Sequence, residues 1–503
     1  MIFETNLKPH PGDIFKIQRA FEARDSEVKR EPNYRRLFSA IRGEVLAGNL
    51  AADSWLPPSR TLARTLGVSR NTVIQAYEQL AAEGYIVGHV GQGTRIASLS
   101  NVDIRRFDTS RGVRKNAARV SKRGKRLTEA LRTTPIEPGT PFIYGMPCVE
   151  SFPFSIWRRL LQRHSLEPLT DTIAYPISGG LPALRAAVCK HLGPARGVDC
   201  DPKQIIVVTS AQAAIDLTAR LLLDEGDVAW IEDPGYLGAR MALQGAGARL
   251  VPVPVDEFGM DITRKTRGQE TPRLIYVTPS SQFPTGTMMS LDRRLLLLDW
   301  ARRCNAWIIE DDYDSEYRYR GQPLTALQSL DERGQVIYVG TFSKTMFPGL
   351  RLAYLVVPER LVENFGKAVQ ITGQESAQLV QAALADFIEE GHFATHVRRM
   401  RTLYSKRQNA LRDSIDRYAR NRLTVQFRDA GMQALAYIDA RNDVAISAAA
   451  KQEGIKAAPL SPMYLGTPPK HGLILGYTSV PQKKYGAAIK TLTKIIEKSS
   501  RAL

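Results

Sequence analysis

The chain has 503 residues, 43% of them hydrophobic and 24% charged, which excludes a mostly disordered or fibrous protein and suits two to four globular domains. Lysine and arginine number 69 against 51 acidic residues, a net charge of +18 that fits either a polyanionic partner or general solubilising charge. The four cysteines are scattered and show no zinc-ligand spacing, which predicts neither a disulfide framework nor a metal site. The sequence shows no apolar leader and no run of about 18 apolar residues, so we expect a cytoplasmic protein without a membrane span.

Residues 1–32 contain no motif that we interpret, and we treat them as an N-terminal extension. The stretch that follows Pro32 places Leu37, Ile41 and Val45 at intervals of four. This spacing predicts an amphipathic helix that ends at Gly48.

Two further helices are predicted between residues 59 and 84. Ser59 is the expected N-cap of the first, Gly67 permits a sharp turn, and Ser69 is the expected N-cap of the second. The second helix has one apolar face, which includes Val73 and Leu80, and its first turn carries hydrogen-bonding side chains. A helix of this kind after a tight turn is what readout of the DNA major groove requires.

A glycine-rich hairpin is predicted after these helices, over residues 85–97, with Gln92 and Arg95 at or near its tip. The whole series, LPPSRTLARTLGVSRNTVIQAYEQLAAEGY followed by GQGTR, resembles the winged helix-turn-helix domains of GntR-family regulators. The resemblance covers residues 33–98 and implies a double-stranded DNA operator as partner. Its candidate DNA contacts are Ser59, Arg60, Ser69, Arg70, Asn71 and Thr72, with Gln92 and Arg95 from the wing.

Residues 99–139 are predicted to be a basic linker. Within them, residues 105–132 hold 11 basic and 2 acidic side chains, a net charge of +9, whereas residues 1–98 hold 13 basic and 10 acidic side chains, a net charge of only +3. The linker could contribute salt-sensitive contacts with DNA phosphates or could be a soluble tether, and the sequence favours neither.

From residue 140 to 503, short apolar runs alternate with helical stretches. The runs QIIVV, VAWIE, RLIYVTP, AWIIED and VIYVGTFS are typical of strands in a buried, mainly parallel sheet. The alternation predicts a doubly wound α/β fold, in which ligands bind beyond the carboxyl ends of the strands.

Polar side chains follow several of these predicted strands. Asp311 and Tyr313 come after one strand, Lys344 after another, and Tyr236 lies in a turn after a third. A fourth strand leads into a helix that begins near Ser210. The free backbone N–H groups in the first turn of this helix could hold a phosphate. A lysine, a carboxylate, an aromatic ring and an anion site are what pyridoxal 5′-phosphate demands. Taken singly, Lys344 could be a surface charge, and the acidic run could be a solvated loop or a divalent-metal site.

The order of these groups resembles the fold-type-I aminotransferases, and the fusion to a reader domain resembles the MocR subfamily of GntR regulators over nearly the whole chain. The strings that carry this resemblance include IEDPGYLGAR, YVTPSSQFPTG, IIEDDYDSEYRY and YVGTFSKTMFPGLRLAY. It implies a smaller α+β subdomain at about residues 390–503 and a head-to-tail homodimer. It also implies that Lys344 forms the Schiff base, Asp311 pairs with the pyridine nitrogen, Tyr313 contacts the phenolic oxygen and Tyr236 stacks on the ring. The phosphate would lie among Ser210, Ala211, Gln212, Thr341 and Arg351.

Four positions depart from the aminotransferase pattern. Ser281 replaces a histidine, Phe283 replaces the asparagine that contacts the cofactor ring, and Ser210 stands where a glycine is common. Near the C-terminus, Ile474 aligns with the arginine that binds the substrate α-carboxylate; an apolar side chain cannot replace such bidentate recognition.

We therefore expect a bacterial transcription regulator that senses pyridoxal 5′-phosphate and controls vitamin B6 metabolism genes. Within the same subfamily, the alternative is a regulator of amino-acid or amine metabolism in which an amino compound displaces Lys344 as an external aldimine. An active aminotransferase that carries a reader domain, and a DNA-binding protein with a vestigial domain, are the rival classes.

Overall fold

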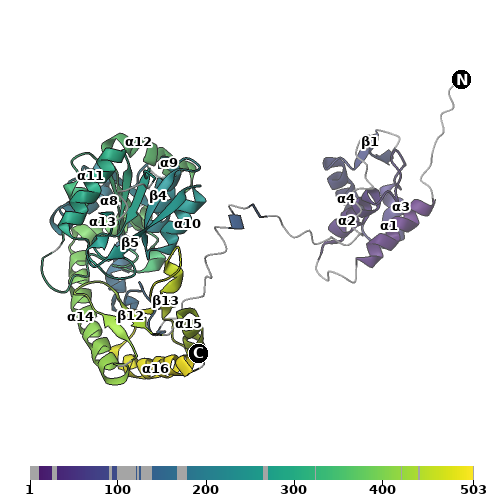
Figure 1. Cartoon of the computed structure of the whole chain (residues 1–503). Helices are drawn as coiled ribbons and strands as arrows, with labels where there is room; N and C mark the ends of the chain where they lie inside the picture. The colour runs from purple at the N-terminus through teal and green to yellow at the C-terminus, as the bar shows by residue number, and fades with distance from the viewer. Residues whose placement is uncertain are drawn as a thin grey trace. The chain divides into compact units, whose positions relative to one another are not determined.

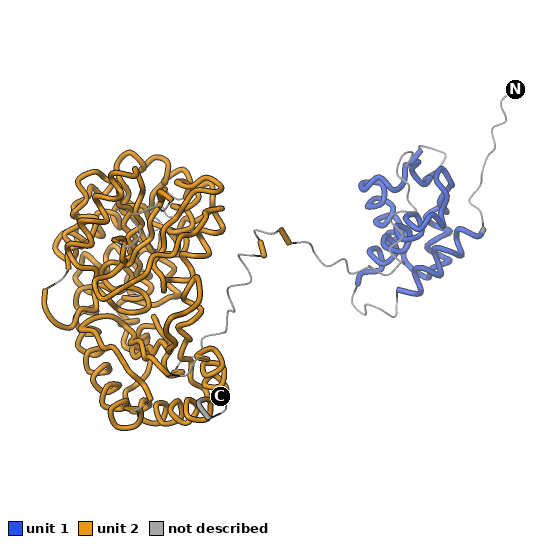
Figure 2. The backbone as a smooth tube through the Cα atoms, in the orientation of Figure 1, with its two compact units in different colours: residues 1–119 blue, residues 120–503 orange. Residues whose placement is uncertain are grey.

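A computed structural model describes residues 11–24, 31–89, 93–98, 120–121, 124–125, 139–166, 178–263, 270–322, 324–420, 422–439 and 442–501. Contacts divide the chain into two compact units, residues 1–119 and 120–503 (Figure 2). Most of the predicted basic linker lies outside the described residues. Over the described ranges, no helix combines the length and apolar character that crossing a membrane requires.

The N-terminal unit is built from four helices and a two-stranded hairpin (Figure 1). In chain order they are α1 (Pro11–Ala23), α2 (Asn33–Leu46), α3 (Ser59–Leu66), α4 (Arg70–Ala82), β1 (Ile86–His89) and β2 (Gly93–Ile96). Gly67 adopts a left-handed conformation between α3 and α4, with φ of 64°, which glycine reaches without steric cost. The predicted helix, turn, helix and wing are all present.

Helix α1 was not predicted, because we had left residues 1–32 without an interpretation. Ile17 and Phe21 of α1 are buried in the same core as Leu37 and Ile41 of α2. Pro11 at the first helical position and Asp13 in the first turn are ordinary signals of a helix start. Part of the N-terminal extension therefore belongs to the folded N-terminal unit.

The two predicted N-caps differ in outcome. Ser69 does cap α4, since its side chain accepts a hydrogen bond from the Thr72 backbone N–H at 3.1 Å. The prediction for Ser59 was wrong: Pro58 occupies the N-cap of α3 without a side-chain bond. Ser59 is the first helical residue, a position from which its hydroxyl is free to contact other groups.

We expect Ile17→Val to lower the stability of the N-terminal unit by about 1 kcal/mol, because it removes one methylene from a closed core. Phe15→Ala on the same helix is the control, since Phe15 is 68% exposed. Thermal unfolding followed by circular dichroism measures both. Equal losses for the two variants would mean that α1 does not pack as described.

The C-terminal unit is centred on an eight-stranded sheet with the order β3-β10-β9-β8-β7-β4-β5-β6. The strands are β3 (Ile205–Val208), β4 (Val228–Asp233), β5 (Arg249–Asp256), β6 (Gly259–Met260), β7 (Leu274–Val277), β8 (Trp307–Asp312), β9 (Val336–Thr341) and β10 (Ala353–Val356). Every apolar run taken as a strand is a strand, and β5, β4, β7, β8 and β9 are parallel.

Two strands depart from the expected parallel arrangement: β6 pairs antiparallel with β5 at one edge of the sheet, and β10 is the second. β10 lies between β3 and β9 and runs antiparallel to both, so β3 has no parallel neighbour among the described strands. The connection from β9 to β10, residues 342–352, contains no α-helix. A parallel return normally needs a helical crossover, so the shorter connection brings β10 back antiparallel.

Helices cover both faces of this sheet, as a doubly wound fold requires (Figure 1). α9 (Ala211–Leu222), α10 (Leu237–Gly245) and α12 (Val362–Ile371) contribute to one core. The cores on the other face take residues from α6 (Phe154–Leu166), α8 (Pro182–Arg196), α11 (Leu291–Cys304) and α13 (Gln378–Glu389).

A smaller α+β part completes the unit. Its antiparallel sheet has the order β11-β12-β14-β13, formed by β11 (Thr424–Gln426), β12 (Gln433–Ile438), β13 (Ala458–Pro459) and β14 (His471–Gly476). Helices α14 (His392–Tyr418), α15 (Asp443–Gln452) and α16 (Tyr485–Arg501) pack with it. Phe142 and Cys148 join the same core from far earlier in the chain.

Candidate cofactor cavity and DNA-contact surface

The main candidate site is a cavity of about 260 Å³ in the C-terminal unit. It gathers all nine residues assigned to a cofactor by sequence: Ser210, Ala211, Gln212, Tyr236, Asp311, Tyr313, Thr341, Lys344 and Arg351. Phe283, which stands in the place of the ring-contacting asparagine, also lines the cavity. Sequence reasoning did not include seven other lining residues, namely Tyr144, Gly145, Tyr276, Thr278, Ser343, Pro348 and Gln433. The sheet topology explains the convergence, because the carboxyl ends of neighbouring parallel strands meet at one edge.

Lys344 follows β9 and extends into the cavity. Its Nζ donates a hydrogen bond to the Gly145 carbonyl at 2.8 Å. Burial lowers the pKa of the Lys344 amine, while Asp314 and Asp311 oppose that shift. Gly145 has φ of 64° and no side chain, so its backbone can approach the amine closely. The lowered pKa shifts the equilibrium toward the neutral amine, the form that attacks an aldehyde.

Asp311, at the end of β8, presents one free oxygen. Its Oδ2 accepts a hydrogen bond from the Tyr276 hydroxyl at 2.6 Å, whereas its Oδ1 is buried without a partner in the described part of the chain. Burial raises the pKa of Asp311 to about 6, against the opposing effects of the Tyr276 hydrogen bond and Lys344. A buried unpaired acceptor is costly, and a protonated pyridine nitrogen is a donor that would satisfy Oδ1.

The N-terminus of α9 forms the anion-binding end of the cavity. Ser210 caps this helix by accepting a hydrogen bond from the Ala213 N–H at 3.1 Å. Ala211 and Gln212 form the first turn, and Thr341 and Arg351 line the same cavity. Helix N-terminal N–H groups together with a guanidinium suit a phosphate. The residues present thus fit both ends of pyridoxal 5′-phosphate.

Aromatic rings form another wall of the cavity. The ring of Phe283 lies 5.9 Å from that of Tyr236, 5.5 Å from that of Tyr144 and 6.2 Å from that of Tyr313. Ser281, which replaces a histidine of the aminotransferase pattern, lies 3.4 Å from the Tyr313 hydroxyl. This wall can hold a planar ring by stacking and edge contacts.

Ile474 does not line the cavity. It lies on β14, is fully buried, and packs in an apolar cluster with Phe283 and Leu435. Among the lining residues, Arg351 is the only arginine, and it stands at the anion-binding end. The described cavity therefore has no second guanidinium that could bind a substrate α-carboxylate.

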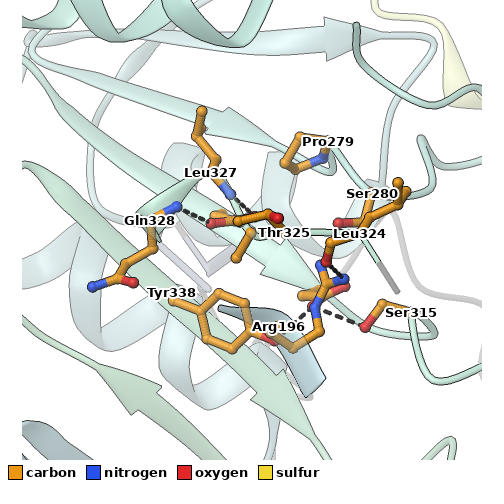
Figure 3. Close-up of polar contacts among 12 residues, drawn as sticks. Arg196, Pro279, Ser280, Ser315, Leu324, Thr325, Leu327, Gln328 and Tyr338 are labelled. Atoms are coloured by element: carbon orange, nitrogen blue, oxygen red, sulfur yellow. Dashed lines mark hydrogen bonds and ion pairs between the residues drawn. The ribbon is translucent and has the colours of Figure 1, made fainter. Parts of the chain in front are cut away.

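A buried ionic network around Arg196 and Asp312 holds the end of β8, and Figure 3 shows the contacts of Arg196. Arg196 contacts Asp312 at 2.7 Å and Ser280 at 2.5 Å, and it also donates to the Leu324 carbonyl. Asp312 further accepts hydrogen bonds from Tyr338 at 2.5 Å and Ser315 at 2.9 Å. Burial disfavours the charged Arg196, but Asp312 and its neighbours outweigh this effect and raise the pKa of Arg196. Because Asp312 follows Asp311, the network also positions the cofactor-facing carboxylate.

The structure brings most of the predicted DNA contacts to one surface of the N-terminal unit. Arg70 Nε lies 3.5 Å from Ser59 Oγ, so the first turns of α3 and α4 are adjacent. The side chains of Arg60, Ser69, Arg70 and Asn71 are exposed, and those of Ser59 and Thr72 are partly exposed. Exposed donors at a helix N-terminus are what groove binding needs.

The wing residues are placed less completely. Gln92 lies outside the described residues. Arg95 stands within β2 rather than at the tip, where it pairs across the hairpin with Val87, and its guanidinium lies 3.5 Å from Asp53. Elsewhere in the described ranges, no group of three His, Cys, Asp or Glu side chains is arranged to hold a metal ion.

Comparisons with known proteins match both units. Residues 33–96 match the family of bacterial regulatory proteins, gntR family, and residues 166–474 match aminotransferase class I and II. The chain is 26% identical to a kynurenine aminotransferase from Pyrococcus horikoshii, whose structure was solved with PMP, with a TM-score of 0.66 over 79% of this chain and 98% of that one. The structure of LysN, an α-aminoadipate aminotransferase from Thermus thermophilus complexed with N-(5′-phosphopyridoxyl)-L-leucine, is 25% identical, with a TM-score of 0.69 over 76% and 98% of the two chains.

Regulators match over almost the whole length. The probable rhizopine catabolism regulatory protein MocR of Rhizobium meliloti is 46% identical over 93% of this chain and 94% of its own. The pyridoxine biosynthesis regulator PdxR of Corynebacterium glutamicum is 31% identical over 88% and 91%. The matched fold is that of enzymes that depend on pyridoxal phosphate, and the matched reader domain implies DNA binding. The chain belongs to the MocR-type transcriptional regulators of the GntR family, in which a helix-turn-helix domain is joined to an aminotransferase-like domain.

Proposed function

We propose that this regulator holds pyridoxal 5′-phosphate on Lys344 and that occupancy of the cavity changes its affinity for a double-stranded operator. The observation that carries the proposal is the meeting of Lys344, the unpartnered Oδ1 of Asp311 and the N-terminus of α9 in one cavity. When bound, the cofactor would supply an aldehyde to the amine and an electron-withdrawing ring.

Each assigned residue has a distinct part in binding. Lys344 presents a largely desolvated amine, and Asp311 Oδ1 would accept a hydrogen bond from the protonated pyridine nitrogen. The phosphate is held by the first turn of α9, capped by Ser210, with Thr341 and Arg351. Tyr236 covers the ring face, and Tyr313 contacts the phenolic oxygen. None of these contacts requires a substrate, which suits a sensor.

The signal is proposed to be the vitamin itself, with vitamin B6 metabolism genes as targets. The apolar surroundings of Ile474 leave an amino acid without its usual carboxylate partner, so a ligand that needs no such partner is favoured. The identity of 31% to a pyridoxine biosynthesis regulator is in line with this assignment.

A second candidate signal is an amine that lacks an α-carboxylate and displaces Lys344 from the cofactor. The higher identity, 46%, to a catabolism regulator favours this candidate, and the same cavity would accommodate it. In both cases ligand and operator would be linked through one conformational equilibrium. A head-to-tail dimer would present two reader domains to two half-sites.

The decisive test is an operator-binding titration with the DNA upstream of the chain's own gene, with and without pyridoxal 5′-phosphate, and then with added amines. We expect the cofactor to change the dissociation constant by about tenfold, a typical coupling between two sites. An effect of the cofactor alone supports the vitamin as signal, and an effect that requires an amine supports the second candidate. Identical binding under all conditions would contradict both.

A working aminotransferase is the rival function. Lys344 and Asp311 supply the groups for a half-reaction, whereas sustained turnover also needs a substrate clamp. Steady-state assays with amino acids and keto acids separate the two functions, since sustained turnover would favour the enzyme.

We expect Arg70→Ala to weaken operator binding by about 1–3 kcal/mol, because Arg70 is exposed in the first turn of α4. Arg19→Ala removes the same charge from the exposed face of α1 and is the matched control. Fluorescence anisotropy with labelled operator measures both variants, and cofactor absorbance should be unchanged in both. Equal affinities for Arg70→Ala and wild type would remove Arg70 from the interface.

A further inference from the structure

A second cavity of about 240 Å³ lies in the C-terminal unit, apart from the residues that line the cofactor cavity. It is formed by the end of α8, the segment 315–321 that follows β8, and the first turns of α14. Its charged lining consists of Arg196, Arg318, Arg398, Arg401 and Glu316. Four guanidiniums face one carboxylate, so positive charge is in excess.

Three of these arginines lack an acidic partner in the described part of the chain. Arg196 is paired with Asp312, but the ion pairs between described residues do not include Arg318, Arg398 or Arg401. Arg401 donates from Nε and one terminal nitrogen to the Glu316 carbonyl, at 3.0 and 2.8 Å. This anchors the guanidinium while its other terminal nitrogen remains available.

Arg318 adds a buried donor without a partner. Its Nε is shielded from solvent and makes no hydrogen bond to a described residue, although a buried donor in this state costs free energy. The Arg318 guanidinium packs over Gly321, where an added Cβ would lie 3.2 Å from its terminal nitrogen. Arg398 is exposed at the mouth. Together these side chains offer planar, multidentate donors around the cavity.

The uncharged and acidic parts of the lining agree with a small anionic ligand. Burial lowers the pKa of His191, so this ring adds little charge at neutral pH. Glu316 is the single carboxylate of the lining, and the ion pair of Arg196 with Asp312 is neutral overall. Burial raises the pKa of Glu316 to about 7, so the lining leaves a net charge between about +2 and +3, the complement of a carboxylate or phosphate group.

We propose that this second cavity binds a small oxyanion, a metabolite that bears a carboxylate or a phosphate group. Guanidiniums recognise both groups through paired N–H donors. The binding does not depend on a cofactor at Lys344, so the proposal stands or falls separately from the proposed function.

The cavity also adjoins the segment that carries Lys344. Tyr317, between Glu316 and Arg318, donates its hydroxyl to the Lys344 carbonyl at 3.1 Å. His396, on the same helix as Arg398 and Arg401, contacts the Thr345 carbonyl at 3.0 Å. An anion that draws the three arginines together would therefore act on the two elements that support Lys344.

Isothermal titration of the full-length chain with sodium phosphate and, separately, sodium succinate tests the proposal, with chloride used to hold ionic strength constant. Arg398→Gln and Arg318→Gln each remove donors that bond no described residue, so both variants should fold. Lys406→Gln removes one charge from an exposed position on the same helix and is the matched control. Any phosphate that binds at the cofactor cavity would do so equally in wild type and in the three variants, so it would not change the comparison between them.

We expect at least one anion to bind saturably, with a dissociation constant raised about tenfold in Arg398→Gln and in Arg318→Gln and unchanged in Lys406→Gln. Binding of succinate alone would assign the site to carboxylates. Binding of phosphate alone would assign it to phosphates only where Arg398→Gln and Arg318→Gln weaken that binding. The proposal is overturned if neither anion binds wild type saturably, if both arginine variants bind like wild type, or if Lys406→Gln weakens binding equally.

Discussion

We expect Lys344→Ala to abolish the visible absorbance that pyridoxal 5′-phosphate gives with the wild-type chain, and to weaken cofactor binding by about a hundredfold or more. The remaining groups, the N-terminus of α9, Arg351 and Asp311, would hold the cofactor only by non-covalent contacts. The variant removes the only lysine among the residues that line the cavity. In the wild-type chain the Nζ of this lysine donates a hydrogen bond to the Gly145 carbonyl. Absorbance titration and equilibrium dialysis measure the two effects.

The control for this variant is Lys190→Ala, which removes an exposed lysine from α8. It should retain the full absorbance, because reaction at surface lysines is not expected to saturate at one cofactor per chain. If Lys344→Ala keeps a saturable absorbance of wild-type intensity, another lysine carries the cofactor and the assignment of Lys344 is wrong.

The second large effect is expected at the buried ion pair. Arg196→Met should lower the unfolding free energy of the C-terminal unit by about 3–5 kcal/mol, since it leaves Asp312 buried without its cation. The side chains of Arg196 and Asp312 are 5% and 1% exposed, so water cannot replace the lost partner. Tryptophan fluorescence in urea reports mainly on this unit, where Trp157, Trp230, Trp300 and Trp307 lie.

Two further variants separate charge pairing from packing. Arg302→Met removes an exposed arginine that pairs with Asp299 and should leave the urea midpoint almost unchanged. Arg196→Met combined with Asp312→Leu removes both buried charges, and it should be more stable than Arg196→Met alone. If Arg196→Met is as stable as wild type, the network in Figure 3 does not hold the end of β8.

The sequence predicted those parts of the fold that are encoded locally. Buried strands such as β3 and β7 are continuous apolar runs, and the polar groups at or after the ends of strands, such as Asp311 and Lys344, converge because parallel strands share an edge. Knowledge of the strand order was not needed for the candidates that lie at or after the ends of the parallel strands. Thr341 was assigned through the family resemblance, and Arg351 precedes the antiparallel β10, yet both line the same cavity.

The features that sequence reasoning missed depend on contacts between distant segments. Gly145 accepts a hydrogen bond from Lys344 although the two residues are 199 positions apart in the sequence, and no local signal marks Gly145 as a partner of the lysine. Tyr276 carries the hydroxyl that bonds Asp311, yet in sequence it is only one apolar residue within a strand. Helix α1 is different, because Pro11, Asp13 and the spacing of Ile17 and Phe21 are sequence signals from which this helix could have been predicted. The antiparallel direction of β10 follows from the lack of a crossover helix, which the sequence pattern did not reveal.

The length of α14 has a mechanical consequence. Its 27 residues make a rod about 40 Å long, whose first turns pack into the core beside the large sheet through Phe393 and Val397 and whose later turns pack into the core of the small sheet. The helix also touches the segment that carries Lys344, because His396 near its start contacts the Thr345 carbonyl at 3.0 Å. Helix α14 is thus a rigid element that joins the segment of Lys344 to the small sheet, and a shift of that segment would be passed along the helix from one core to the other.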